Sequence, residues 1–248
     1  MSLSSSTLIH FANSKDALKG ILENNFKIFN CKETIVLDGK PVSLHIPMVS
    51  FCDIPLSKIK EHIIKYGSYG IGLRKEWAIA NELNPVLYVS KKSALAKSYK
   101  VAFNHFVSDV SGELSKSSEE IQCIADIVRY IKNYEGDLTR KGTTIKSYRY
   151  SDEREWRYVP CFKDYPDMVV SANWYMQKDN KASCDSLLES LRLHFEPNDI
   201  KYIIIRDDSE ISEFIDHLRK AKGKKYTHED VERLTTRILT TEQIQADV

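Results

Sequence analysis

MVSFCDIPLSKIKEHIIKYGSYGIGLRKEW, residues 48–77, holds two closely spaced turns around which the predicted fold is built. An apolar run ends in Cys52-Asp53-Ile54-Pro55, a helix-like segment follows, and Tyr66 to Gly70 leads into the apolar run Ile71 to Leu73. Asp and Pro favour the first turn, and the glycines of the second turn allow backbone conformations that other residues resist. The pattern predicts a strand, a helix and a second strand, whose turns either frame a site or serve as ordinary connections.

Strands and helices intermix on both sides of this stretch. Predicted strands are short apolar runs, and they lie at Thr7–Phe11, Ile35–Leu37, Val42–Ile46, Met48–Phe51, Ile71–Leu73, Val86–Val89, residues 145–160 with a bend at Ser151-Asp152, Tyr202–Ile205 and Ile238–Thr240. Predicted helices carry an apolar face, and they lie after Ser14, at Lys58–Tyr66, Glu76–Glu82, Lys91–Phe106, Ser118–Ile131, Ser183–Leu193 and Ile211–Ala221, and after Thr227.

Local signals set several element ends. Ser14 and Ser57 are expected N-caps, because a serine hydroxyl accepts a hydrogen bond from the first turn of a helix. Asp38-Gly39 predicts a hairpin turn, since both residues tolerate left-handed backbone. Pro47 is expected to interrupt the strand after this hairpin. The Ser-rich, charged stretch Ser108–Ser118 is expected to be a loop.

The order of these elements predicts an α+β fold, because hairpins and helices mix without a regular βαβ repeat. A chain of 248 residues is long enough to bury a substantial core. We expect a single domain over residues 1–248, with a helical insertion at about residues 91–135.

Composition excludes several classes of protein. The 36 Lys and Arg nearly balance the 35 Asp and Glu, so a general electrostatic affinity for nucleic acid is not expected, and a DNA-binding repressor is disfavoured. The five cysteines are odd in number and show no C-x-x-C spacing, which indicates free thiols in a reducing compartment. The sequence has neither a secretory signal nor an apolar run of membrane-spanning length, so a cytoplasmic protein is expected.

The stretch Glu153 to Tyr158 is the second informative part of the sequence. In an extended strand, Glu153, Glu155 and Arg157 share one face, and an arginine and two aromatic residues share the other. One interpretation is a half-buried strand whose Glu and Arg side chains lie in water. The other is a pair of carboxylates in an active site.

His10, Tyr66, Tyr69 and Glu155 together suit the chemistry of a nicotinamide dinucleotide. A glutamate can bind a ribose hydroxyl and stabilise the cation that develops as a glycosidic bond breaks. Aromatic rings can hold nicotinamide, and a histidine can orient the other ribose.

In that chain order, these residues resemble the His, Tyr and Glu triad of ADP-ribosyltransferases, and Glu153 is similar to the first glutamate of that fold's E-x-E turn. The resemblance implies an ADP-ribosyltransferase-like mixed sheet and NAD as a substrate. It implies that Glu155 stabilises the oxocarbenium-like state and that Glu153 orients the acceptor or the ribose. The residues expected to bind NAD are His10, Phe11, Asp53, Tyr66, Tyr69 and Arg157.

A second resemblance covers most of the chain, and it is to the AbiGi family. The stretches that carry it are Thr7–Phe11, Ile46–Leu56, Tyr66–Leu73, Pro85–Tyr88 and Glu153–Arg157. That family is described as the antitoxin half of a two-component abortive-infection system against phage. Both resemblances together imply an AbiGi-like protein on an ADP-ribosyltransferase-like fold, akin to the DarT toxins, which also begin with a short His-containing strand and a helix.

Two functions follow from these resemblances. The first is an antiphage protein that binds NAD and transfers ADP-ribose to a nucleic-acid or protein acceptor. The alternative is a non-enzymatic antitoxin that binds and restrains a partner toxin. His62 is a plausible neighbour of the predicted site, and the histidines show no ligand spacing, so no metal is expected.

Overall fold

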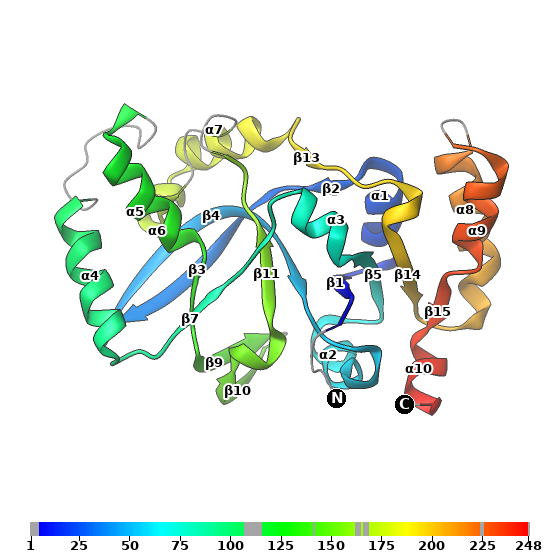
Figure 1. Cartoon of the computed structure of the whole chain (residues 1–248), viewed down its shortest axis with the longest axis horizontal. Helices are drawn as coiled ribbons and strands as arrows, with labels where there is room; N and C mark the ends of the chain where they lie inside the picture. The colour runs from blue at the N-terminus through cyan, green and yellow to red at the C-terminus, as the bar shows by residue number, and fades with distance from the viewer. Residues whose placement is uncertain are drawn as a thin grey trace. The chain divides into compact units, whose positions relative to one another are not determined.

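The computed structural model describes residues 5–106, 116–140, 142–161, 165, 169–223 and 226–247. Their contacts form two compact units. Unit 1 comprises Met1–Lys27, Ser50–Leu83 and Arg192–Val248, and unit 2 comprises Ile28–Val49 and Asn84–Leu191. Helices and strands intermix within each unit (Figure 1), so the fold is α+β, as predicted. The single-domain assignment stays a prediction.

The main sheet of unit 1 has the strand order β15-β14-β5-β1. Strands β14 and β15 are parallel, whereas β14 with β5 and β5 with β1 are antiparallel. Cys52, the last residue of strand β4, pairs with Ile9 at the other side of β1. The strands of this unit are β1 (Thr7–Ala12), β5 (Tyr69–Arg74), β14 (Ile200–Ile205), β15 (Ile238–Thr240) and the short pair β2 (Phe26–Lys27) and β13 (Arg192–Leu193).

Helices flank this sheet. They are α1 (Lys15–Asn24), η1 (Leu56–Lys58), α2 (Lys60–Tyr66), α3 (Lys75–Ala80), η4 (Pro197–Asp199), η5 (Asp208–Glu210), α8 (Ile211–Lys222), α9 (His228–Thr235) and α10 (Thr241–Asp247). One apolar cluster joins Ile9 and Ile204 of the sheet to Ile59, Ile63 and Ile244. Full burial of each such side chain stabilises the fold by about 1.5–3 kcal/mol. The cluster therefore fixes α2 and α10 against the sheet.

Gly72 lets strands β5 and β14 pack closely. A Cβ atom at this position would lie 2.9 Å from Tyr202 and 3.0 Å from Thr7, which is too close for ordinary van der Waals contact. The glycine of the Tyr66–Gly70 turn has a different role, because Gly67 ends α2 with a φ of 116° that other residues rarely adopt.

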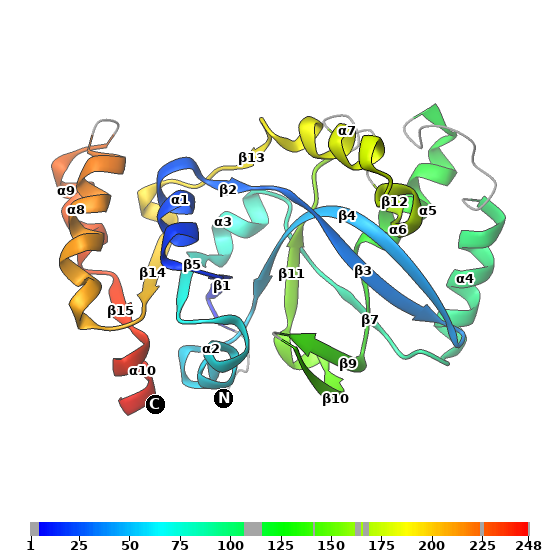
Figure 2. The same ribbon diagram turned by 180° about the vertical axis from the view of Figure 1, so that it is seen from behind.

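Unit 2 is built on the long hairpin of β3 and β4, which Figure 2 shows from behind. Asp38 and Gly39 form its two-residue turn with φ values of 51° and 74°, as predicted. Further strands and strand pairs complete the unit: β3 (Phe29–Leu37), β4 (Lys40–Cys52, of which residues 40–49 belong here), β6 (Asn84–Pro85), β7 (Leu87–Val89), β8 (Ile131–Asn133), β9 (Glu135–Arg140), β10 (Thr143–Arg149), β11 (Glu155–Tyr158) and β12 (Val170–Ser171).

Two helices cover the β3–β4 hairpin of unit 2. Ala96 and Tyr99 of α4 and Ala125 and Val128 of α5 join one apolar cluster with residues of the hairpin such as Ile46. The Tyr99 hydroxyl donates to the Ile124 carbonyl at 2.6 Å, which links the two helices. The helical segments of this unit are α4 (Ala94–Phe106), α5 (Glu119–Arg129), η3 (Tyr150–Glu153), α6 (Ala172–Tyr175) and α7 (Lys178–Leu188).

Several predicted element ends are confirmed and others are wrong. Ser14 caps α1, because its hydroxyl accepts the Ala17 N–H at 3.1 Å. Ser57 caps nothing, since it lies inside η1, and α2 begins after Ile59 without a side-chain cap. Pro47 does not interrupt its strand: it pairs with Asn30 inside β4, where a missing N–H is tolerated if the ladder does not use it.

Two further predictions concern helix length and a loop. The helix predicted to reach Leu193 ends at Leu188, and Leu193 lies in β13 opposite Phe26. Its apolar side chain is thus buried by a strand pairing that local periodicity cannot show. The predicted loop Ser108–Ser118 lies outside the described residues up to position 115. No helix in the described part of the chain is both long and apolar enough to span a membrane.

Candidate functional site

The residues predicted to form the site belong to different compact units. His10, Phe11, Asp53, Tyr66 and Tyr69 belong to unit 1, and the two glutamates and the arginine of the E-x-E stretch belong to unit 2.

Glu155 is the centre of a buried ionic cluster in unit 2. Its carboxylate accepts a hydrogen bond from Arg157 Nε at one oxygen and from Lys132 Nζ at the other, both at 2.6 Å. The Glu155 residue is only 4% exposed and Arg157 is fully buried. Both oxygens of the predicted catalytic carboxylate are thus engaged by cations of the same chain.

Arg157 extends this cluster to two other elements. Its Nη2 donates to Glu33 Oε2 on β3 at 2.9 Å, and its Nη1 donates to the Arg129 carbonyl at the end of α5 at 2.7 Å. A guanidinium offers donors in a planar fork, so Arg157 can bind both carboxylates and a carbonyl at once. The side chain fixes β11 to β3 and α5.

Glu153 lies at the edge of the same cluster. Its carboxylate is 4.0 Å from Lys132 Nζ, and the lysine also lies over the Tyr150 ring at 5.2 Å. Glu153 belongs to the 3-10 segment η3 and not to the strand, because Arg154 adopts left-handed backbone before β11 begins. Lys132 nevertheless brings the two glutamates of the E-x-E stretch to one cation.

The pKa shifts follow from this arrangement. Burial alone would raise the pKa of Glu155, but Arg157 and Lys132 lower it by more, so its pKa lies well below the usual range. Burial would likewise lower the pKa of Lys132, yet Glu155 and Glu33 hold it above the ordinary value. Glu155 and Lys132 are therefore both ionised near neutral pH.

Strand β11 buries the face that its sequence suggests is exposed. Glu155 and Arg157 are buried, and the intervening Trp156 and Tyr158 are only half-buried. The predicted sharing of one face by Glu155 and Arg157 is confirmed, but the interpretation in which these charges lie in water is wrong. Partners on other elements make the burial tolerable, because ionised groups need hydrogen-bonded counter-charges in a dry interior.

Three members of the cluster were missed by reasoning from sequence. Glu33 lies on β3, Lys132 lies on β8, and the Tyr88 hydroxyl of β7 accepts the backbone N–H of Glu155 at 2.8 Å. Tyr88 has a raised pKa, chiefly because it is buried. Tyr88 and Lys132 are brought together by the parallel pairing of β7 with β8. Of the three, only Tyr88 lies in a stretch that carries the family resemblance, Pro85–Tyr88.

In unit 1, Tyr66 and Phe11 form an aromatic group with His62. The centroids of Phe11 and Tyr66 and those of His62 and Tyr66 are 5.9 Å apart, and those of Phe11 and His62 are 6.2 Å apart. The ring planes differ by only 21–25°. His62 is thus a neighbour of the predicted Tyr66 position, as the sequence suggested, although each ring packs on residues of the chain itself.

His10 packs among aromatic rings. Its Nδ1 lies 2.8 Å from the Ser50 carbonyl, and its ring contacts Phe26 edge-on and Phe51 at a tilt. Burial lowers the pKa of His10, and the bond to Ser50 only partly opposes this. The imidazole is therefore neutral near pH 7, and its role toward a ribose stays a prediction.

Asp53 and Tyr69 make polar bonds within unit 1. Asp53 is buried, and it accepts bonds from the Ser5 N–H at 2.9 Å and from Lys75 Nζ at 2.8 Å. The Tyr69 hydroxyl donates to Glu210 at 2.9 Å. Burial and this bond raise the pKa of Tyr69. Both side chains hold the first and second turns of the 48–77 stretch in place, and their predicted contacts with NAD are untested.

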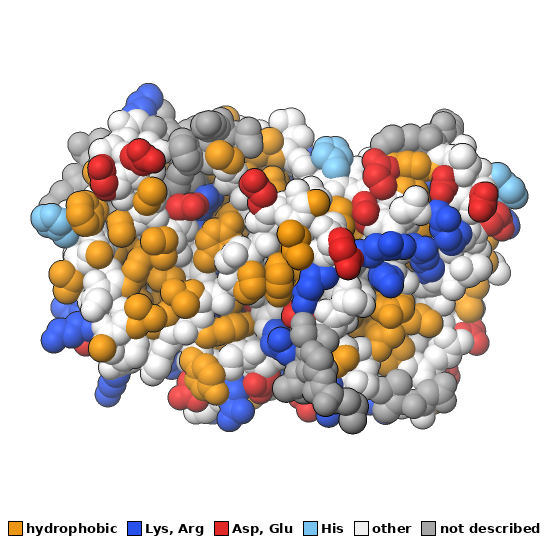
Figure 3. All heavy atoms as spheres, in the orientation of Figure 1, with side chains coloured by type: hydrophobic (Ala, Val, Ile, Leu, Met, Phe, Trp, Pro, Cys, Tyr) orange, Lys and Arg blue, Asp and Glu red, His pale blue; other side chains and the backbone are white. Residues whose placement is uncertain are grey.

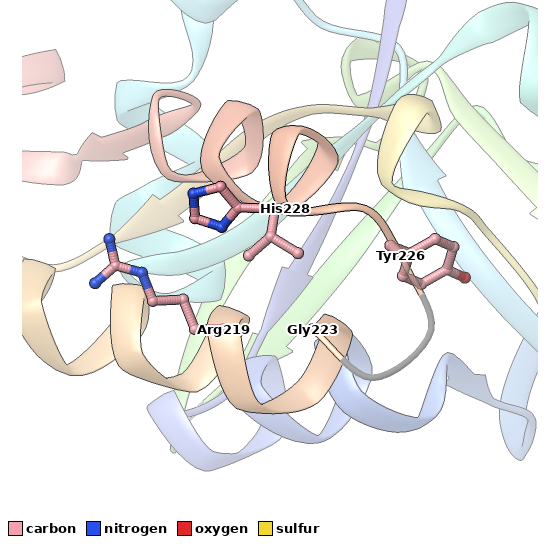
Figure 4. Close-up of a pocket in the computed structure, with 5 residues that line it drawn as sticks. Arg219, Gly223, Tyr226 and His228 are labelled. Atoms are coloured by element: carbon pink, nitrogen blue, oxygen red, sulfur yellow. The ribbon is translucent and has the colours of Figure 1, made fainter.

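A separate hollow of about 280 Å³ lies between α8 and α9 of unit 1 (Figure 4). Arg219, Gly223, Tyr226, His228 and Val231 line it, and Figure 4 shows Arg219 and His228 near one end and Tyr226 at the other. Arg219 is already engaged, because it donates to the Glu232 carboxylate at 3.1 and 3.3 Å. None of the predicted site residues lines this hollow. The described residues contain no group of His, Cys, Asp and Glu arranged to hold a metal ion.

Comparisons with known proteins agree on one family. Residues 23–206 match the model of a family described as "Putative abortive phage resistance protein AbiGi, antitoxin". The abortive phage resistance protein AbiGi of Lactococcus lactis subsp. cremoris is 28% identical over 222 residues, which cover 82% of this chain and 89% of that protein. No solved structure matches significantly. The family match includes the β3–β4 hairpin and the whole Glu155 cluster, and the chain belongs to the AbiGi family.

Proposed function

We propose that this protein is the antitoxin component of an abortive phage resistance system and that it acts by binding and restraining a partner toxin. The match to the AbiGi model over residues 23–206, with its description as an antitoxin, carries the proposal. A binding function needs a stable folded surface and no reactive group.

The Glu155 cluster supports a structural role for the residues that look catalytic. A catalytic carboxylate must reach the reacting atoms, whereas both oxygens of Glu155 are held by Arg157 and Lys132. The guanidinium of Arg157 is bound in turn by Glu33 and by a backbone carbonyl. In this state the cluster joins β11, β3, β8 and α5, and no oxygen of Glu155 is presented to a substrate.

Co-expression with the protein encoded by the neighbouring gene tests the proposal. We expect the two proteins to co-purify in a fixed ratio and the growth defect caused by the neighbour alone to disappear. The Glu155→Gln variant, after its folding is checked by circular dichroism, should rescue growth as well as the wild type. Failure of the folded wild-type protein both to bind the neighbour and to restore growth would overturn the antitoxin assignment.

A second candidate function is NAD binding followed by ADP-ribosyl transfer, on an ADP-ribosyltransferase-like fold. The lowered pKa of Glu155 favours it, because a carboxylate that stabilises a developing cation must be ionised. For that role one of the pairs with Arg157 or Lys132 has to open. His10, Phe11, Asp53, Tyr66, Tyr69 and Arg157 would then bind NAD, and Glu153 and Glu155 would act on it.

Calorimetry with NAD distinguishes the two functions. Saturable binding that is lost in Tyr66→Ala and kept in Tyr134→Ala, a change at an exposed tyrosine, would support the second candidate. Release of nicotinamide that stops in Glu155→Gln would assign the reaction to that glutamate. Absence of binding at millimolar NAD would remove this candidate and leave the antitoxin function.

A further inference from the structure

Four cationic side chains of unit 1 gather around the turn that begins β14. They are Arg74, Lys201, Arg233 and Arg237, and we call them the basic band. Figure 3 shows Lys and Arg side chains in a band over the region where Figure 1 labels β14 and α9. They come from β5, β14, α9 and the connection between α9 and β15.

Arg233 and Arg237 both bind the segment formed by η4 and the first residue of β14. Arg237 precedes β15, and its Nη1 donates to the carbonyls of Pro197, at 3.3 Å, and Ile200. Arg233 of α9 donates to the Asn198 side chain and to Asp230. Both guanidiniums are therefore held at η4 by fixed bonds.

Arg74 and Lys201 reach the same place through strand pairing. Leu73, next to Arg74, pairs with Ile200, and the next pair along the strands is Gly72 with Tyr202. The register shift between Ile200 and Tyr202 leaves Lys201 as an extra residue, as in a β-bulge. A bulge turns a side chain away from the ordinary alternation of a strand, and bulges are common beside functional sites.

The basic band is short of counter-charge. Among the described residues, Arg74, Lys201 and Arg237 have no carboxylate partner, and only Arg233 forms an ion pair, with Asp230 at 2.6 Å. Burial and the nearby charges of Arg233 and Arg74 lower the pKa of Arg237. Like charges brought together on a rigid turn are unfavourable by themselves, and an anionic partner would offset this cost.

We propose that the basic band is the surface through which this protein binds a cluster of Asp and Glu carboxylates on its partner toxin. The inference rests on the proposed antitoxin function, and it identifies the surface that contacts the toxin. Guanidiniums suit carboxylates because two parallel N–H groups can bind both oxygens. Arg74 is exposed, and its side chain makes no hydrogen bond or ion pair with other described residues.

The surroundings favour an acidic protein over nucleic acid. Glu196 and Asp199 cap η4 beside the band, and their charges repel carboxylates and phosphates alike, so the apolar surroundings decide between the two partners. The half-buried side chains of Tyr202 on β14 and of Ile238 and Leu239 on β15 are apolar in large part, and Figure 3 shows hydrophobic side chains next to the blue band. A local carboxylate cluster with an apolar border is typical of a protein surface.

Fluorescence anisotropy with a labelled octaglutamate peptide tests the surface without the toxin. We expect saturable binding at low salt that weakens about tenfold in the Arg74→Glu, Lys201→Glu double variant, because reversed charges repel the peptide. The side chains of these two residues make no hydrogen bond or ion pair with other described residues, so the variant should stay folded. Lys58→Glu, a charge reversal at an exposed lysine of η1, is the matched control and should bind like the wild type.

The same variants with the co-expressed toxin separate this inference from the proposed function. Loss of the complex in the double variant but not in Lys58→Glu supports the inference. A complex that survives the double variant keeps the antitoxin function and overturns the basic band as its surface. Peptide binding without any toxin complex would overturn the antitoxin function. It would also overturn the assignment of the toxin as the partner of the basic band. Tighter binding of a single-stranded DNA oligonucleotide than of octaglutamate through the same residues would also overturn it.

Discussion

The charged side chains of the Glu155 cluster in unit 2 are buried and paired, whereas most of those in the basic band of unit 1 are accessible and lack a carboxylate partner. Glu155, Arg157 and Lys132 are inside the protein, and every one of them has a counter-charge at 2.9 Å or less. Arg74 and Lys201 are more accessible and have no carboxylate partner among the described residues. Buried charges need counter-charges from their own chain because they have lost their contact with water. Surface charges stay solvated, so they can remain unpaired until another molecule binds. The residues that look most catalytic in the sequence are therefore the ones that the fold already uses.

The largest expected effect is on stability, at Arg157. Replacing it with Met leaves Glu155 and Glu33 without the guanidinium that both of them bind, and removing one partner of a buried pair costs about 3–5 kcal/mol. Urea denaturation followed by circular dichroism measures the loss. Arg149→Met is the control, because the pair of Arg149 with Asp152 is long and exposed, and it should change the free energy of unfolding by less than about 1 kcal/mol. Equal small losses in the two variants would show that the cluster is not an internal support.

A smaller effect is expected in the dependence of stability on pH. The folded protein holds the pKa of Glu155 below its ordinary value of 4.5, so its stabilising contribution is present above about pH 4.5 and is lost as the pH falls. The free energy of unfolding of the wild type should therefore fall more steeply between about pH 5 and pH 3 than that of Glu155→Gln. Equal slopes would contradict the ionised, paired state of Glu155.

Salt distinguishes buried ion pairs from exposed ones. Glu213 on α8 also has a lowered pKa, of about 2, because Lys15 and Lys19 donate to it, but its side chain is 46% exposed. At about 1 M NaCl the Debye length is only about 3 Å, so the difference in pH slope between the wild type and Glu213→Gln should vanish. The difference between the wild type and Glu155→Gln should persist, since buried pairs are screened much less. If both differences disappear, the Glu155 pair is accessible to solvent.

The smallest expected effect is at Arg74. Replacing it with Gln removes one of several like charges and breaks no side-chain bond with other described residues. The free energy of unfolding should therefore change by less than about 0.5 kcal/mol, and toward a gain at low salt. Thermal unfolding at low and high salt measures this change. A loss of more than about 1 kcal/mol would mean that Arg74 supports the fold, and the contrast with Arg157 would then fail.

The local features of this protein follow from its sequence. Asp38-Gly39 makes its hairpin, Ser14 caps its helix and Gly67 ends another, because each depends on the conformational or hydrogen-bonding properties of one or two neighbouring residues. The α+β class and the AbiGi family follow from the order of such elements and motifs. The shared face of Glu155 and Arg157 also follows, because strand alternation is local.

Which charged side chains meet depends on the tertiary fold. Glu33, Lys132 and Arg157 come from three strands, and their burial depends on pairings that no local pattern contains. Arg74 and Arg237 meet at the start of β14 because β5 and β15 lie on its two sides. The energy of a charge depends on the distance to other charges and on the water around it, and both are set by contacts between residues far apart in the chain.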